Sequence, residues 1–199
     1  MTKVIVLNGP PECGKDESTY ILDNYLWETL PLYCMSFKMP LYEIVAAIYG
    51  VEADWVFEVN DDREVKDIPQ KQLGGKSVRQ TLIEVSEGVI KPYYGKDFFG
   101  QTAVKTMKGN SSKLFIFSDS GFEEELEPVS NYVGKENVIL CRIRNRGTFS
   151  NDSRSFLSDK HAGTVLDYDN SGSLHELHDW VESVGDMILK ELEIDATGC

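Results

Sequence analysis

The sequence predicts an α/β fold in three layers, in which a mainly parallel central sheet is flanked by helices. Short, wholly apolar runs recur along the chain, as in parallel strands that are covered on both faces. Segments with helical spacing of apolar residues separate these runs, so strand and helix alternate throughout. A glycine-containing loop follows the first apolar run directly. A chain of 199 residues, 41% of them hydrophobic, suits a single domain over residues 1–199 with a substantial core.

The predicted strands are the apolar runs that glycine, proline or polar residues interrupt. Residues 4–7 form the first run, since the glycines and prolines of residues 9–14 come directly afterwards. The complete set is residues 4–7, 32–37, 114–117, 138–143 and 164–166.

The predicted helices follow from apolar residues three and four positions apart and from their start signals. Pro40 suits a first helical turn, and Ser77 is a good N-cap. The helix that Pro40 opens has its apolar stripe at Leu41, Ile44, Val45 and Ile48. The other helices are predicted at residues 15–28, 78–89, 97–107, 122–132 and 174–188. The polar stretches 60–76 and 145–160 are predicted as loops.

The charge of the chain limits its partners. A net charge of -13 argues against a large surface that follows nucleic-acid phosphates, although a basic cleft can lie inside an acidic shell. No apolar run approaches the length of a membrane span, and the N-terminus lacks a signal-peptide pattern. We therefore expect a cytoplasmic protein with reduced cysteines, of which Cys34 and Cys141 are predicted to be buried thiols.

The strongest motif is the phosphate loop, Gly9-Pro10-Pro11-Glu12-Cys13-Gly14-Lys15-Asp16, between the first strand and the first helix. Its glycines let backbone N–H groups surround phosphate oxygens, and Lys15 adds a positive charge. The following helix, with Glu17 in its first turn, presents its positive end to the same anion. A chance glycine turn is the alternative, and the strand–loop–helix context argues against it.

Asp16 stands where this motif usually has Ser or Thr to ligate magnesium. A carboxylate is also a hard oxygen ligand, so Asp16 is predicted to hold Mg²⁺ directly or through water. Asp119 is the second predicted magnesium residue, because it ends an apolar strand at the position of a Walker B acid. The alternative for Asp119 is a helix cap, a role that Ser120 would also suit.

Several basic residues could meet phosphates. Arg144, Arg146 and Arg154 lie in or beside the polar stretch 145–160, which is interpreted as a mobile lid over the triphosphate. Arg142 and Arg144 share one face of their strand. The candidates to hold an acceptor phosphate are Lys38, Arg63, Lys66 and Arg79. The alternative for each of these residues is a solvated surface charge.

Other candidates carry less information. His175 and His178 are predicted to be surface residues, because no third metal ligand accompanies them. Four aromatic residues could line a base pocket but would more commonly belong to the core; they are Tyr93, Tyr94, Phe98 and Phe99.

With these motifs in place, the chain resembles the bacteriophage deoxynucleoside monophosphate kinases, a branch of the P-loop nucleotide kinases. The family's phosphate loop also ends in Gly-Lys-Asp, as Gly14-Lys15-Asp16 does here. Shorter similarities follow in order along nearly the whole chain. They are Ser36-Phe37-Lys38-Met39-Pro40-Leu41, Asp62-Arg63-Glu64-Val65-Lys66, Ser77-Val78-Arg79, Arg144 with Ser150-Asn151-Asp152-Ser153, and Asn170-Ser171-Gly172-Ser173-Leu174-His175-Glu176-Leu177.

The chain departs from this family in two ways. The family often has Asp-x-Arg after its Walker B strand, whereas Asp119 is followed here by Ser120 and Gly121. The chain is also shorter than typical members, which leaves little room for a large acceptor domain. Both departures leave open a related phage activity, the phosphorylation of 5-hydroxymethyluracil bases in DNA, for which Asp119 would take the proton from an alcohol.

The resemblance implies a P-loop kinase fold, a small lid, and ATP- and Mg²⁺-dependent phosphoryl transfer to a (deoxy)nucleoside monophosphate. Lys15 and the loop would hold ATP. Arg144, Arg146 and Arg154 would neutralise the transferring group. The acceptor would be a small nucleotide. DNA is the alternative acceptor, and a regulatory module that binds nucleotide without turnover is a further alternative. No membrane partner is expected, and the sequence leaves a homodimer open.

Overall fold

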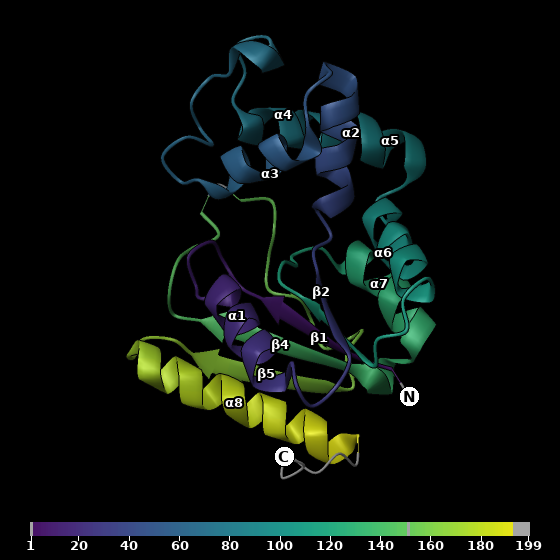
Figure 1. Ribbon diagram of the computed structural model, residues 1–199, viewed down its shortest axis with the longest axis vertical. Helices are drawn as coiled ribbons and strands as arrows, with labels where there is room; N and C mark the ends of the chain where they lie inside the picture. Colours follow the sequence, from purple (N-terminus) through teal and green to yellow (C-terminus); the bar gives the residue numbers. More distant parts are fainter. Residues whose placement is uncertain (1, 151, 193–199) are drawn as a thin grey trace.

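The computed structural model describes residues 2–150 and 152–192, and it has the predicted α/β architecture. A five-stranded sheet, all parallel, forms the middle layer in the order β2-β3-β1-β4-β5 (Figure 1). Its strands are β1 (Lys3–Asn8), β2 (Leu32–Met35), β3 (Leu114–Phe117), β4 (Val138–Arg144) and β5 (Thr164–Asp169).

Helices cover both faces of this sheet. α1 (Lys15–Leu26) and α8 (Leu174–Glu191) lie on one face and enclose a core with Ile5, Leu7 and Ile116. α6 (Phe98–Lys108) and α7 (Glu123–Val133) lie on the other face, against Val4 and Phe115. Apolar side chains thus point to both sides of each central strand, which explains why the strands appear in the sequence as unbroken apolar runs.

A helical arm, residues 39–94, leaves the sheet after β2 and stands beyond its carboxyl edge (Figure 1). It contains α2 (Met39–Tyr49), α3 (Ala53–Asp61), a 3₁₀ turn (Lys71–Leu73), α4 (Val78–Val85), a π-helical segment (Ser86–Ile90) and α5 (Lys91–Tyr94). Ser77 caps α4 with a capping box that Gln80 completes, which confirms the predicted start of this helix.

The strand order places several loops at one edge of the sheet. β1 lies between β3 and β4, and the connection from β3 crosses β1 to reach β4. Ligands of open parallel sheets bind beyond the carboxyl ends of strands at such reversals. The loops after β1, β2, β3 and β4 all leave this edge, so the arm, the phosphate loop and the predicted lid surround one region.

Some predictions of local structure were wrong. α3 was not predicted, because its polar residues Glu58, Asn60 and Asp61 obscure the apolar spacing. β2 ends at Met35 rather than at residue 37, and Ile48, assigned to an apolar stripe, is 56% exposed. Cys141 is buried as predicted, whereas Cys34 is only partly buried. No helix within the described part of the chain is both long and apolar enough to span a membrane.

Candidate active site

The phosphate loop turns through a backbone conformation that favours glycine. Gly14 is the N-cap of α1 and has φ 103°, in the left-handed region. A Cβ at Gly9 would lie 2.6 Å from the carbonyl oxygen of Ile143 and 2.5 Å from Cys13 Sγ. The loop therefore packs closely against β4, and both glycines of the motif have a steric reason to be glycine.

Lys15 folds back over the loop that precedes it. Its ammonium group donates to the carbonyl oxygens of Gly9 at 2.8 Å and Pro10 at 2.7 Å, and the residue is only 7% exposed. Burial lowers the pKa of Lys15 below its ordinary value, and the neighbouring charge of Arg154 acts in the same direction. A positive charge is thus held inside the loop, where the sequence motif predicts a phosphate.

Asp16 and Glu17 occupy the first turn of α1, beside the loop, and both are exposed. Acidic residues in a first turn are favourable partners of the positive helix end, but they also compete with a phosphate for it. An exposed carboxylate next to a phosphate site suits magnesium coordination, because oxygen ligands from protein and phosphate can then share the ion.

Two residues distant in sequence brace the phosphate loop from behind. Asn170, at the end of β5, is 2% exposed, and its Nδ2 donates to the carbonyl oxygen of Cys13 at 2.8 Å. Gly147 has φ 74°, and a Cβ there would lie 2.0 Å from the carbonyl oxygen of Pro11. The segment after β5 therefore holds the loop through a hydrogen bond, and the segment after β4 packs closely against it.

Asp119 follows β3 and anchors the beginning of the arm. Its Oδ1 accepts from the backbone N–H of Phe37 at 2.8 Å, and its Oδ2 accepts from Ser36 Oγ at 2.9 Å and the N–H of Lys38 at 3.3 Å. The predicted cap of the following helix does not form, because α7 has Phe122 at its N-cap position. Asp119 instead holds the chain that leads into α2.

Lys38 lies at the start of α2, next to Asp119. Burial lowers the pKa of Lys38, but the Asp119 carboxylate and the Tyr42 phenol more than compensate, so the pKa lies above its ordinary value. Tyr42 is 4% exposed and accepts a hydrogen bond from Asn60 Nδ2 at 3.0 Å. A charged lysine is therefore held at the junction of sheet and arm.

Arg154 reaches the same interior from the lid segment, residues 145–160. Asp152 fixes its guanidinium in a fork, with Nε 2.9 Å from Oδ1 and Nη2 2.6 Å from Oδ2. The hydrocarbon part of Arg154 crosses Gly121, where a Cβ would lie 2.4 Å from the Arg154 Cβ. The charge of Arg154 acts to lower the pKa of both Lys15 and Lys38, so the structure brings these three predicted residues near one another.

Hydrogen bonds join the second half of the lid segment to the carboxyl edge of the sheet. Asn8, fully buried at the end of β1, donates to the carbonyl oxygen of Ser155 at 3.1 Å and accepts from the N–H of Leu157 at 2.9 Å. The N–H of Ser155 donates to the carbonyl oxygen of Gly121 at 3.1 Å. Asn151 of the predicted lid motif lies outside the described residues, and the motion of the lid stays a prediction.

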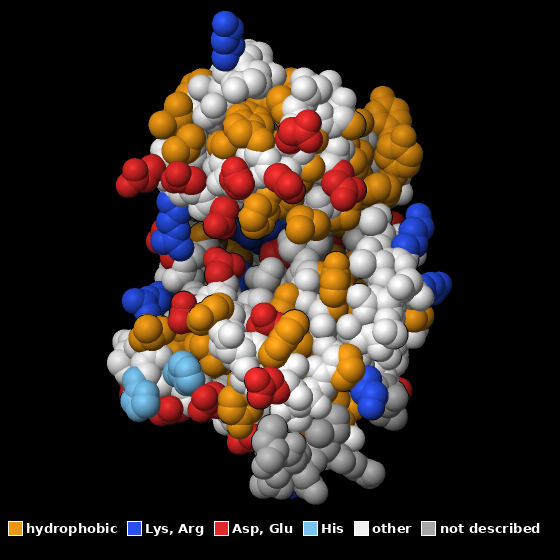
Figure 2. Space-filling view, in the orientation of Figure 1, with side chains coloured by type: hydrophobic (Ala, Val, Ile, Leu, Met, Phe, Trp, Pro, Cys, Tyr) orange, Lys and Arg blue, Asp and Glu red, His pale blue; other side chains and the backbone are white. Residues whose placement is uncertain are grey.

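Three predicted acceptor residues lie on the side of the arm that meets the phosphate loop. Arg63 pairs with Glu12 of the loop at 3.1 Å, and Arg79 pairs with Asp67 at 2.9 Å. Lys66 lies close enough to both arginines that they help lower its pKa, after the larger effect of burial. Figure 2 shows a hollow between the arm and the layers below it, with basic and acidic side chains along it.

The remaining arginines are placed differently. Arg142 and Arg144 both pair with Asp167 of β5, and the guanidinium of Arg144 lies 4.3 Å from the centre of the Phe156 ring. Arg146 is exposed beyond the end of β4. Within residues 2–150 and 152–192, no ion pair or hydrogen bond joins these three arginines to Lys15 or Asp119.

Glu125, in the first turn of α7, was not among the predicted site residues. Its side chain is 8% exposed, and burial together with the Asp119 carboxylate raises its pKa to about 8. Lys91 of α5 lies 4.0 Å away, 3.6 Å from the centre of the Phe122 ring, and pairs with Glu87 at 2.7 Å. In the sequence, Glu125 is simply the last of three successive glutamates at a helix start.

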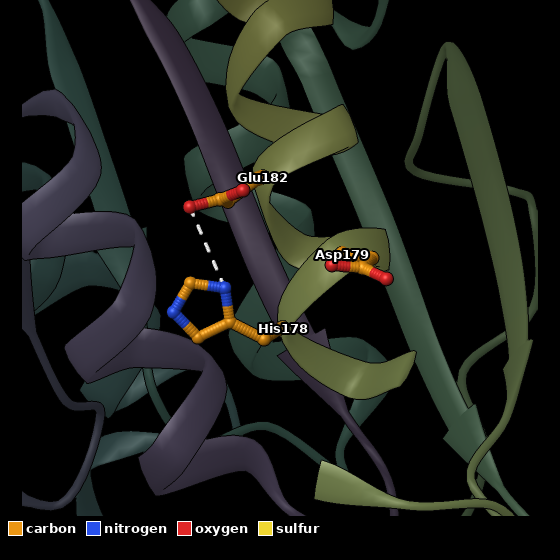
Figure 3. A group of neighbouring side chains, drawn as sticks. All are labelled: His178, Asp179 and Glu182. Atoms are coloured by element: carbon orange, nitrogen blue, oxygen red, sulfur yellow. Dashed lines mark ion pairs between the residues drawn. The ribbon is translucent and has the colours of Figure 1, made fainter. Parts of the chain in front are cut away.

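The predicted surface histidines are exposed on α8. His178 points to Glu182 with 3.4 Å between Nδ1 and Oε1, and Asp179 is the third residue of this group (Figure 3). All three side chains are at least 39% exposed, and such i,i+4 pairs are common on helix surfaces. This exposed group therefore gives no reason to assign a metal site.

The chain was compared with known proteins. No protein-family model matches it, and no curated protein matches it in sequence. Among solved structures, it is similar to shikimate kinase from Aquifex aeolicus, with 14% identity, a TM-score of 0.34 and coverage of 96% of each chain. Similarity at this level assigns no activity to the chain.

Proposed function

We propose that this protein is a P-loop phosphotransferase that moves the γ-phosphoryl group of ATP to the 5′-phosphate of a (deoxy)nucleoside monophosphate. The observation that carries the proposal is the ammonium group of Lys15, held against Gly9 and Pro10 at the start of α1. A buried positive charge beside a helix N-terminus, in a loop of glycines, is an anion site whose expected ligand is a chain of phosphates.

The donor phosphates would replace the carbonyl oxygens as partners of Lys15. An incoming phosphate offers a full negative charge, and charge-assisted hydrogen bonds are about twice as strong as those to neutral carbonyls. The N–H groups at the start of α1 would contact the same phosphate oxygens. Asn170 supports the loop through its hydrogen bond to Cys13, and Gly147 packs closely against Pro11.

The residues present fit a magnesium ion on one side of the loop. Asp16 is exposed in the first turn of α1 and would ligate the ion directly. Asp119 has about one of its roughly four lone-pair positions left after its contacts with Ser36, Phe37 and Lys38, so a bridging water suits it better. When bound, Mg²⁺ neutralises the donor phosphates and aligns them for transfer.

The transferring group would pass between Lys15 and Arg154. Positioning and charge neutralisation supply most of the catalysis in phosphoryl transfer. A monophosphate oxygen is already an anionic nucleophile, so no strong base is required. Arg63, Lys66 and Arg79 lie opposite the phosphate loop and would hold the acceptor phosphate, with Lys38 at the junction.

The acceptor class is supported by the resemblance of the phosphate loop, which ends in Gly-Lys-Asp, to phage deoxynucleoside monophosphate kinases. One departure from that family now has a structural counterpart. Gly121 stands in the place of an arginine, and the side chain of Arg154 crosses it. An arginine from the lid segment would thus serve the phosphates instead of one from the loop after β3.

The test is a panel of transfer assays with labelled ATP and Mg²⁺. The acceptors are the common nucleoside monophosphates, ribo and deoxy, and duplex DNA containing 5-hydroxymethyluracil. Lys15→Ala is the inactive variant, and Lys105→Ala, an exposed lysine in α6, is the matched control. We expect labelled diphosphate from one or more monophosphates with wild type and Lys105→Ala, and a loss of at least about 100-fold with Lys15→Ala.

Two results would contradict the proposal. Label in DNA alone would move the acceptor to a polymer and make the protein a base kinase. Tight ATP binding without transfer to any acceptor would identify a nucleotide-binding module instead.

A further inference from the structure

A largely buried carboxyl group lies in the first turn of α7, beyond the carboxyl end of β3. The side chain of Glu125 is 8% exposed. The Lys91 ammonium group forms an ion pair with it at 4.0 Å, which is too long for a hydrogen bond. Burying a carboxyl group with so distant a partner costs free energy in general, so its retention calls for a reason.

The charged groups around Glu125 come from five parts of the chain. Asp119 follows β3, Arg154 belongs to the lid segment, Lys91 to α5, Glu87 to the π-helical segment, and Glu124 precedes it on α7. These carboxylates outnumber the cations. In addition, Arg154 forms an ion pair with Asp152, and Lys91 forms one with Glu87. These surroundings favour the neutral carboxylic acid, which both donates and accepts hydrogen bonds.

The position of Glu125 suits a different part of the acceptor from the part that the basic residues would hold. Glu125 lies in the first turn of α7, which begins shortly after Asp119 at the carboxyl end of β3, so it is close to the region in which the phosphates are proposed to meet. The charges of Asp119 and Arg154 both act on it. The basic residues of the arm carry the charges that an acceptor phosphate needs and would hold it. The part of the acceptor that reaches Glu125 should therefore be uncharged and polar.

We propose that Glu125 is a specificity-determining residue of the acceptor site, where its carboxyl group hydrogen-bonds an uncharged polar group of the acceptor, a sugar hydroxyl or a base edge. This inference rests on the proposed function, because it needs a nucleotide acceptor. It goes further in naming the part of the acceptor that is recognised and the residue that recognises it.

The test measures binding separately from transfer. Nucleoside monophosphates, ribo and deoxy with each common base, are titrated by calorimetry into Lys15→Ala protein, alone and combined with Glu125→Leu, Glu125→Gln or Glu124→Gln. Glu125→Leu keeps the volume and removes the hydrogen bonds, and Glu125→Gln keeps a neutral group that donates and accepts. Glu124→Gln is the matched control one residue away on the same helix turn.

We expect Glu125→Leu to weaken binding of the preferred acceptor about tenfold, as loss of one hydrogen bond does. Glu125→Gln should lose less than Glu125→Leu, and Glu124→Gln should bind like the parent protein. A loss confined to one sugar would identify a sugar hydroxyl as the partner, and a loss confined to one base would identify a base edge. In active protein, the acceptor KM should rise above about pH 8, and Glu125→Gln should abolish that rise.

The outcomes also separate this inference from the proposed function. Unchanged acceptor affinity and selectivity in Glu125→Leu would overturn the role of Glu125 while leaving the kinase intact. Acceptor binding that depends on Glu125, without transfer by wild type, would overturn the kinase and keep the recognition. If no nucleoside monophosphate binds, both proposals fail.

Discussion

The side chain of Arg154 crosses the Cα of Gly121, so closely that a methyl group there would lie 2.4 Å from the Arg154 Cβ and 2.5 Å from its Cγ. We predict that Gly121→Ala displaces the guanidinium and lowers kcat/KM about 100-fold, since a shift near 1 Å in a transfer site has an effect of that order. Steady-state kinetics test this. Gly109→Ala, where the nearest atom is 3.6 Å from the added Cβ, is the control and should retain activity.

Asp152 is predicted to act through Arg154. Asp152→Asn removes the charged fork and should lower kcat more than it raises either KM, because the guanidinium loses its fixed position. The effects of Asp152→Asn and Gly121→Ala should combine less than additively, since both act on one side chain. Additive losses in the double variant would show that the two residues act independently.

Asp119 is predicted to stabilise the fold as well as the site. Asp119→Asn should lower the free energy of unfolding by about 1–3 kcal/mol, because the partly buried Ser36 hydroxyl and the N–H groups of Phe37 and Lys38 lose an ionised acceptor. Urea denaturation measures this, with Ser36→Ala as the smaller, single-bond comparison. Wild-type stability together with lost activity would assign Asp119 to magnesium alone.

Glu125 is predicted to make stability depend on pH. Its folded pKa of about 8 lies above the unfolded value, so the neutral form is favoured by folding, and stability present at low pH is lost as pH rises toward 8. Glu125→Gln should therefore gain roughly 1–3 kcal/mol over wild type between pH 5.5 and pH 8. Urea unfolding at both pH values checks this; equal differences at the two would contradict it.

Asp16 is predicted to set the magnesium requirement. Asp16→Ala should raise the Mg²⁺ concentration for half-maximal activity at least about tenfold, whereas Asp16→Ser should retain part of the affinity through its hydroxyl oxygen. Activity titrated with Mg²⁺ after chelation measures both variants. Glu28→Ala removes an exposed acid beyond the end of α1 and should leave the requirement unchanged.

Local signals explain which parts of the fold could be predicted from the sequence. β1 and β3 contain unbroken apolar runs and β4 begins with one, because both faces of these segments are buried, and Ser77 marks the start of α4. α3 escaped prediction because Val56 is its only buried residue, so packing imposes little apolar spacing on it. The π-helical segment Ser86–Ile90 likewise has no distinct sequence pattern.

The candidate site likewise has one part that the sequence predicts and another that depends on tertiary packing. The phosphate loop is a continuous segment whose glycines and lysine act on one another, so its sequence was sufficient to predict it. The positions of Arg154 over Gly121 and of Glu125 beside Asp119 depend on how distant segments pack. Glu125 in particular has the sequence context of an ordinary acidic first turn, and only its burial distinguishes it.

The helical arm is an excursion between two strands that are already neighbours. β2 and β3 pair directly, with Met35 opposite Phe117. This strand pairing does not depend on the length of the chain between the two strands. The arm's departure and return are confined to the Asp119-bound residues near Lys38 and to the turn at Gly95, with φ 100°. We predict that another arm grafted between these two points would change the proposed acceptor while the proposed donor loop stays the same.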